Sequence, residues 1–271
     1  MSKPLTVPNH PLTWLITGQW TPRVATFRNP GKTPKLVQQV EAPGGQWLKL
    51  DVDDLASGDL VNYLERNGSH VDVLVNNAGW SIHGPAEGFT EEETRSQMDT
   101  VFFGPCRLTR AVAPFMRKRR PWTGLSEVLA KELSPLGVRV LAVQLGTFDT
   151  NMGPTAKFSS NPIPADYEES LVGRMCQMMA ASATEGFPAD GDHLKASRVI
   201  YEVVTATGVG VGKENQRMPP LGRDLAKRVD DVVAGYQASV QAFRDVCTNI
   251  YLENKQSATE SCWYSSWPTA K

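Results

Sequence analysis

The sequence of 271 residues, of which 41% are hydrophobic, is long enough for one sizeable α/β domain or two small ones, and nothing in its composition suggests disorder. A formal net charge of −1 creates no field that attracts nucleic acid or an anionic membrane, so we expect a small-molecule partner, no nucleic acid and no membrane. Four scattered cysteines without metal-ligand spacing, and an N-terminus without an apolar signal segment, predict a reduced protein of the cytoplasm.

Two apolar runs open the chain, LTWLITG at 12–18 and RVATFRNP at 23–30, and each is typical of a buried strand. Only residues 19–22, with the sequence QWTP, lie between them. A parallel strand pair usually needs a crossover of about ten or more residues, whereas a tight connection reverses the chain and makes the pair antiparallel. We therefore predict that this linker cannot carry a parallel crossover and that a segment is missing here.

Helical and strand patterns then alternate along the chain. A short helix is predicted over 34–41, a strand in WLKLDV ending near Asp51, a helix over 57–66, and a buried strand in VDVLVNNAG at 71–79. The last strand is continuously apolar, as expected where helices cover both faces of a parallel sheet. This alternation predicts a doubly wound α/β sheet.

The second half of the sequence is predicted to be mainly helical. Thr90 and Glu93 form a capping box that opens a long helix ending in the basic cluster 117–120, which we interpret as a solvated helix end and not as a nuclear signal. The further predicted elements are a helix over 123–133, a buried strand over 137–146, a Met-rich helical stretch around 175–179, a helix near 197–205 and an amphipathic helix from 223 to about 250.

At NNAG, residues 76–79, the sequence resembles the short-chain dehydrogenase/reductase family. Further motifs of the family occur in its order: Thr17-Gly18 after the first strand, ATFRNP after the second, LDV at 50–52, and GLSEVLAKEL followed by SPLGVRVLAVQLGTFDT. The resemblance implies a single Rossmann-like domain, with residues 12–224 family-like, 225–250 a C-terminal helix and 251–271 a tail. It also implies an NADP-dependent oxidoreductase acting on a secondary alcohol or ketone of an apolar small molecule, such as a steroid, a retinoid or a secondary metabolite.

The resemblance further implies a set of cofactor-binding residues at the carboxyl ends of the strands. These are Thr17, Gly18, Arg28, Asp51, Asn76, Asn77, Ala78, Gly79, Arg110, Thr147, Thr150 and Asn151. Arg28 is placed to bind a ribose 2′-phosphate, and because no acidic residue occupies its position, NADP is favoured over NAD. Plainer interpretations stay open: Arg28 and Arg110 as surface charges, and Asn76 as a structural residue.

The sequence departs from the family pattern in two places. The glycine-rich turn and first helix are absent between the first two strands, and only Pro121, Trp122 and Thr123 stand where a fifth strand, a catalytic Ser and a Tyr-x-x-x-Lys are expected. Val101 replaces the supporting Asn of the family. Tyr251 and Lys255 have the catalytic spacing, but they follow the last family element, so we interpret them as an exposed helix end and assign no catalytic residue.

Three interpretations follow from this incomplete Rossmann-like sheet, which lacks one crossover helix and one strand. The sequence has lost two segments of an active enzyme, or the chain is a non-catalytic relative that binds a partner or a nucleotide fragment, or no stable fold forms. In each case we expect NADP binding to be weakened or lost. The helix predicted over 90–120 is the surface that family members commonly use to form homo-oligomers.

Overall fold

The structure is a computed structural model, and it describes residues 12–18, 24–29, 31, 34–119, 133, 136–150, 156–185 and 189–250. The chain divides into two compact units, residues 1–225 and 226–271. No helix in the described part of the chain combines the length and the apolar character that a bilayer crossing requires.

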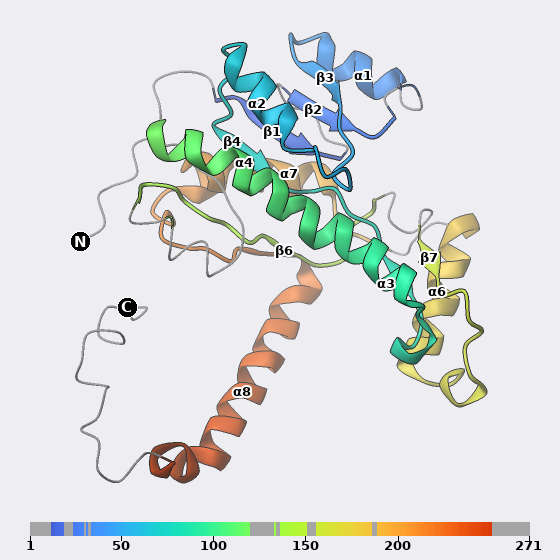
Figure 1. The fold of residues 1–271 in the computed structure, drawn as a ribbon. Helices are drawn as coiled ribbons and strands as arrows, with labels where there is room; N and C mark the ends of the chain where they lie inside the picture. Colours follow the sequence, from blue (N-terminus) through green and yellow to red (C-terminus); the bar gives the residue numbers. More distant parts are fainter. Residues whose placement is uncertain are drawn as a thin grey trace. The chain divides into compact units, whose positions relative to one another are not determined.

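The first unit is built on a sheet of four parallel strands in the order β3-β2-β1-β4 (Figure 1). The strands are β1 (Trp14–Thr17), β2 (Val24–Phe27), β3 (Gln46–Lys49) and β4 (Val73–Val75). A parallel sheet of this order, combined with helices, confirms the predicted Rossmann-like α/β fold.

The pairing of β1 with β2 corrects the prediction about their connection. The two strands are parallel, with Leu15 opposite Val24 and Thr17 opposite Thr26. The prediction was wrong because it counted linker residues without considering strand length. Each strand has four residues, so the return path is only about 10 Å at about 3.3 Å per residue. The residues between Thr17 and Val24 can span about 20 Å when extended, so a parallel return does not require a crossover helix.

One face of the sheet is covered by α2 (Asp59–Arg66) and α4 (Gly104–Arg119). Leu15, Val24 and Leu74 point to this face and pack with both helices in one continuous core. The members of this core are Leu15, Val24, Leu50, Val52, Val61, Leu64, Val71, Leu74, Leu108, Val112, Met116, Leu133, Val138 and Val140. The core therefore fastens both helices to the same three strands.

The opposite face is covered by α1 (Pro34–Glu41) and α7 (His193–Thr205) in two separate clusters. One cluster joins Ala25 and Trp47 to Val40 of α1. The other contains Trp14, Ile16 and Val73, with Val204 of α7 packed against it. The ring of Trp14 also stacks on Tyr201 at a centroid distance of 5.5 Å.

The predicted long helix is present as three consecutive helical segments, α3 (Glu91–Met98), a π-helical turn (Asp99–Phe103) and α4 (Figure 1). The predicted capping box is confirmed, since Glu93 N donates to Thr90 Oγ1 at 3.2 Å and Thr90 N donates to Glu93 Oε2 at 2.8 Å. α4 begins at Gly104, where a Cβ atom would lie 2.8 Å from the carbonyl oxygen of Val52. Glycine thus permits the close approach of the helix to the loop after β3.

The remaining elements include two small parallel pairs outside the main sheet. β5 (Ile82–His83) pairs with β7 (Lys157–Phe158), and β6 (Gln144–Leu145) pairs with β8 (Pro220–Leu221). The other segments are η2 (Ala86–Gly88), η5 (Ala165–Tyr167), α6 (Leu171–Glu185), η6 (Gly208–Gly210) and α8 (Arg223–Asn249).

Most predicted helices are confirmed, but the strand predicted over 137–146 is confirmed only at its end. Val138 and Val140 are buried without being in a strand, and β6 pairs with β8 and not with the main sheet. In the described residues the four-stranded sheet therefore ends at β4. The helix predicted over 123–133 lies outside the described residues, apart from Leu133.

Candidate functional site

The carboxyl ends of β1 and β4 are joined by hydrogen bonds from Thr17 to the NNAG segment. The Thr17 hydroxyl accepts from the backbone N–H groups of Asn77 and Ala78, both at 2.9 Å, and donates to the carbonyl of Val75 at 3.3 Å. The side-chain amide of Asn77 donates to the Thr17 carbonyl at 3.0 Å. These contacts use both acceptor positions and the proton of the hydroxyl, so the loop after β4 is fixed against β1.

Gly18 follows Thr17 and lies directly against the same loop. Its φ of +82° is in the left-handed region that favours glycine. A Cβ atom at this position would lie 3.0 Å from Nδ2 of Asn77 and 3.4 Å from Cα of Ala78. Gly18 therefore permits the close approach of β1 and the NNAG segment. The sequence from 19 to 23 contains no further glycine.

Arg28, immediately after β2, is held between two carboxylates. Its Nε lies 3.5 Å from Oδ1 of Asp51 and its Nη2 lies 3.4 Å from Oδ2 of Asp53, while 57% of the Arg28 side chain stays exposed. Asp53 in turn accepts from the hydroxyl of Thr100 at 2.7 Å, and Trp80 Nε1 donates to that hydroxyl at 3.0 Å. The guanidinium group is thus oriented at the rim of the sheet with donors left toward solvent.

Asp53 and Thr100 belong to this rim but were not predicted. Asp53 lies two residues after Asp51 in LDVDD, and its backbone N–H donates to Oδ1 of Asp51 at 3.1 Å. That local spacing is the only signal in the sequence for Asp53. Thr100 reaches the rim from the π-helical turn, 47 residues further along the chain, and carries no comparable signal.

Asn76 lies between β4 and α4. Its side-chain nitrogen donates to the hydroxyl of Thr109 at 3.5 Å, and its Oδ1 is buried and accepts from no described residue. An unsatisfied buried carbonyl is unusual in a folded protein. It lies next to β4, the strand at which the sheet ends.

The other predicted residues are distributed over several places. Gly79 is exposed, and a Cβ on it would lie 3.9 Å from Val101. Arg110 is an exposed residue of α4. Thr147 follows the β6–β8 pair, where its N–H and hydroxyl donate to Asp224 at 3.2 and 2.9 Å. Thr150 is exposed, and Asn151 lies outside the described residues.

The structure therefore brings together six of the predicted residues at one rim. They are Thr17, Gly18, Arg28, Asp51, Asn77 and Ala78. An Arg guanidinium beside polar backbone at the ends of parallel strands fits the adenosine end of a dinucleotide. The pyrophosphate does not fit equally well, because the described element that follows β1 is another strand and not a helix whose N-terminus could bind it.

The structure and the sequence offer little for proton transfer near this rim. Of the six tyrosines in the full sequence, only Tyr251 is followed by a lysine four residues later, and it lies outside the described residues. The region around 120–124, where we predict that the catalytic segment of the family is missing, also lies outside them. His83 contacts Ser81 Oγ through Nε2 at 2.9 Å, and burial lowers the pKa of His83.

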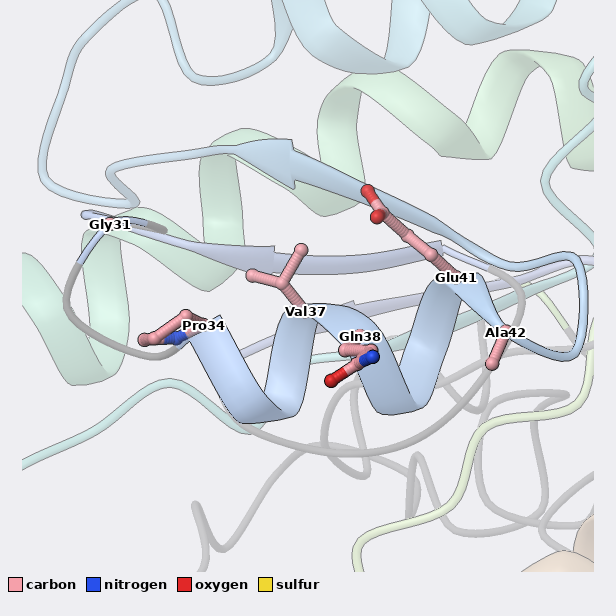
Figure 2. Close-up of a pocket in the computed structure, with 6 residues that line it drawn as sticks. All are labelled: Gly31, Pro34, Val37, Gln38, Glu41 and Ala42. Carbon is pink, nitrogen blue, oxygen red and sulfur yellow. The ribbon is translucent and has the colours of Figure 1, made fainter.

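A separate hollow of about 820 Å³ lies along α1. Figure 2 shows its lining, which consists of Gly31, Pro34, Val37, Gln38, Glu41 and Ala42. None of these is a predicted site residue, and we assign the hollow no role. Within the described residues, no group of three or more His, Cys, Asp or Glu side chains is arranged to hold a metal ion.

Comparisons with known proteins agree with this arrangement. The family described as short chain dehydrogenase matches residues 21–121. Bovine retinol dehydrogenase 8 is 41% identical over 244 residues, which covers 78% of this chain and 74% of that protein. The oxidoreductase claN of Passalora fulva is 33% identical over 178 residues, which covers 55% of this chain and 78% of that protein. The matched part of this chain, 55% of its 271 residues, is shorter than the alignment of 178 residues. Some residues of claN within the alignment therefore have no counterpart in this chain.

Solved structures show the same fold. A short-chain dehydrogenase from Streptomyces avermitilis superimposes with a TM-score of 0.71 at 27% identity, covering 89% of this chain and 99% of that protein. A short-chain dehydrogenase from Sphingobium yanoikuyae, solved in complex with NADPH, gives a TM-score of 0.53 at 17% identity, covering 91% and 98% of the two chains. The second likeness bears on the fold alone.

Proposed function

This chain belongs to the short-chain dehydrogenase family of oxidoreductases, and we propose that it keeps the adenosine end of an NADP(H) site but does not transfer hydride. The observation that carries this proposal is the rim itself. Thr17 fixes the NNAG segment against β1, and the Arg28 guanidinium lies at the end of the neighbouring strand. These neighbouring contacts support a site for the adenosine end of the cofactor.

The preference for NADP(H) over NAD(H) rests on Arg28. A guanidinium group makes charge-assisted, often bidentate hydrogen bonds to a phosphate. Asp51 and Asp53 contact one side of Arg28, and the exposed remainder of the guanidinium can still donate to a ribose 2′-phosphate. The two carboxylates also weaken the local positive field, so we expect moderate affinity and not tight binding.

The proposed loss of hydride transfer rests on two segments of the sequence. Between Gly18 and Val24 there is no second glycine to let the backbone approach a pyrophosphate. Between β4 and the end of α8 the sequence has no Tyr-x-x-x-Lys pair to donate or accept the substrate proton, since the single pair with that spacing begins at Tyr251. The chemistry that the family performs therefore lacks its acid–base group in this chain.

A second candidate is an active oxidoreductase whose complete chain contains two further segments. The claN alignment favours this candidate, because it includes positions for which this chain has no residue. Its substrate would be a secondary alcohol or ketone on an apolar molecule, by likeness to retinol dehydrogenase 8. Sequencing the transcript across codons 18–24 and 120–124 separates the two candidates. Additional in-frame codons for a glycine-rich turn and a Tyr-x-x-x-Lys would establish the active form.

Ligand titration tests the main proposal. We expect 2′,5′-ADP to bind about tenfold more tightly than 5′-ADP, the ratio that one charge-assisted contact of about 1.4 kcal/mol gives. NADPH should bind no more than a few-fold more tightly than 2′,5′-ADP, because the pyrophosphate of NADPH gains little binding free energy from this chain. Arg28→Ala should remove the preference for the 2′-phosphate, whereas Arg95→Ala, which removes an exposed arginine paired with Glu91, should leave it unchanged.

Two results would contradict the proposal. One is equal affinity for 2′,5′-ADP and 5′-ADP in the unaltered chain. The other is nanomolar NADPH binding with measurable oxidation of NADPH by a ketone, since either property requires groups that the sequence does not supply.

A further inference from the structure

The helix α8 carries apolar residues at alternating intervals of four and three. The positions are Val229, Val233, Tyr236, Val240, Phe243, Cys247 and Ile250, the last being the residue that follows the helix. This spacing is the heptad repeat of a two-stranded coiled coil and extends over three heptads. We propose that α8 pairs with α8 of a second copy of this chain in an antiparallel coiled coil.

Six of the seven side chains in the row are exposed to solvent, and Val229 is partly buried. Tyr236 is 73% exposed, Phe243 is 60% exposed and Ile250 is 75% exposed. On the opposite side of the helix, Asp231 and Asp245 occupy positions that a coiled coil leaves in water. Aromatic and aliphatic residues in one continuous row, with acids behind them, are typical of a surface that another helix covers.

The sizes of the side chains favour an antiparallel partner. When two copies of α8 run in opposite directions around a centre at Ala238, Val233 faces Phe243 of the second copy and Tyr236 faces Val240. Each large ring then meets a smaller β-branched residue, which lets the layers interdigitate. In a parallel pair Tyr236 would face Tyr236 and Phe243 would face Phe243, and the layers would alternate between crowded and loose.

The flanking residues favour the same direction. In the antiparallel arrangement Asp230 lies beside Arg244 of the second copy, and two-fold symmetry produces this pair twice. On the other flank, Val232 lies beside Val246 and widens the apolar seam. In a parallel pair Asp230 would flank Leu225 and Arg244 would flank Ser239, so no charges would match. Exposed ion pairs contribute little affinity but do select orientation.

Mass measurements test whether the pair forms. We expect light scattering and sedimentation of the full chain to show a concentration-dependent dimer. Phe243→Glu should raise the dimer dissociation constant at least tenfold, because it places a charge in the seam. The neighbouring Ala242→Glu, which introduces the same residue on another side of α8, should leave the dimer intact with an unchanged circular dichroism spectrum.

Three outcomes of that experiment would overturn the proposal. The unaltered chain could stay monomeric at high micromolar concentration. The unaltered chain could be monomeric while Phe243→Glu lowers its thermal stability, which would show that other residues of the same chain cover the apolar row. It could also form a dimer that Phe243→Glu leaves unchanged, which would assign the interface to another surface such as α3–α4.

Cross-linking tests the direction of the pair. In the antiparallel arrangement Cys247 faces Val229 of the second copy, so the variant Val229→Cys should form an intermolecular disulfide between positions 229 and 247 on oxidation. Peptide mapping distinguishes it from a bond between two Cys247 residues, which a parallel pair would give and which would overturn the proposal. The two positions are about 27 Å apart along one helix, so they cannot bridge within a copy.

A charge exchange supplies an independent test. Asp230→Arg should weaken the dimer several-fold by placing two arginines together, and adding Arg244→Asp should restore it. A parallel pair predicts no restoration, since these residues are not neighbours there. Failure of either experiment leaves the proposed nucleotide site untouched, because that site is argued from residues of the first unit alone, between Thr17 and Thr100.

Discussion

The two faces of the four-stranded sheet are covered in different ways. On the face of Leu15 and Leu74, α2 and α4 pack into one continuous core. On the face of Ile16 and Ala25, α1 and α7 cover two separate clusters of three buried residues each, one on β1 and β4 and one on β2 and β3. The division falls between β1 and β2, the two strands whose connection is too short to contain a covering helix.

The handedness of crossovers explains why the second face is the divided one. The strand order places β2 beside β1 and β3 beside β2, so both connections step in the same direction along the sheet. Right-handed crossovers that step in the same direction lie on the same face. A helix between β1 and β2 would therefore lie beside α1, but the connection is too short to form one, and among the described helices α1 and α7 pack on this face in two separate clusters.

The largest expected loss of stability comes from the continuous core. Leu108→Ala removes a side chain that is 0% exposed on α4 and leaves a cavity enclosed by both helices and the sheet. We expect the free energy of unfolding to fall by about 3 kcal/mol. Chemical denaturation measures this change, and Leu55→Ala, at a leucine that is 85% exposed, is the control with almost no expected effect.

The same face contains an ion pair that ties α2 to α4, in which Glu65 is buried and the Arg119 side chain is 27% exposed. Both Nη atoms of Arg119 donate to the carboxylate of Glu65 at 2.6 Å, and the backbone N–H of Val71 donates to it at 3.0 Å. Glu65→Gln should lower the free energy of unfolding by about 2 kcal/mol, because it leaves the guanidinium without its counter-charge. The exposed pair of Glu91 and Arg95 provides the control, and Glu91→Gln should change stability by less than about 0.5 kcal/mol. Equal effects at the two sites would contradict this view of the core.

The Glu65 carboxylate also predicts a pH dependence. Burial by itself raises its pKa, but hydrogen bonds from Arg119, His70 and Val71 and the charge of Arg119 outweigh burial and hold the pKa below the usual 4.5. A carboxyl group whose pKa is lower in the folded state stabilises the fold above the unfolded value and loses this effect as the pH falls through the folded value. Denaturation between pH 5 and pH 3 should therefore show a steeper fall in stability for the unaltered chain than for Glu65→Gln.

A matched pair of valines compares the two faces directly. Val112 on α4 and Val40 on α1 are each 2% exposed, and each is replaced by alanine. We expect Val112→Ala to cost about 1 kcal/mol more than Val40→Ala, because the smaller cluster around Val40 can collapse into the space that is left. Thermal and chemical denaturation of both variants measures the difference. A larger cost for Val40→Ala would show that the divided face is packed as tightly as the continuous one.

These contrasts also show which features can be predicted from the sequence. The capping box at Thr90 and the helix over 34–41 follow from local signals, and both are present. The parallel pairing of β1 with β2 was missed, because linker length alone does not set direction when strands are short. The contacts of Thr147 with Asp224, 77 residues apart, and of Thr100 with Asp53, 47 residues apart, depend on tertiary packing and have no local signature.

The smallest effect is expected at the end of α7, on the divided face. Ala206 caps this helix with a φ of 52°, the single non-glycine residue in the described part of the chain with positive φ. A Cβ in the left-handed region costs about 1 kcal/mol, whereas glycine adopts it freely but loses more entropy on folding. Ala206→Gly should therefore stabilise the fold by about 0.5 kcal/mol. The gain should be seen as a higher denaturation midpoint with an unchanged slope. If α7 contributes little to folding because its cluster is small, the midpoint will stay the same, and the divided face would then be held mainly by α1.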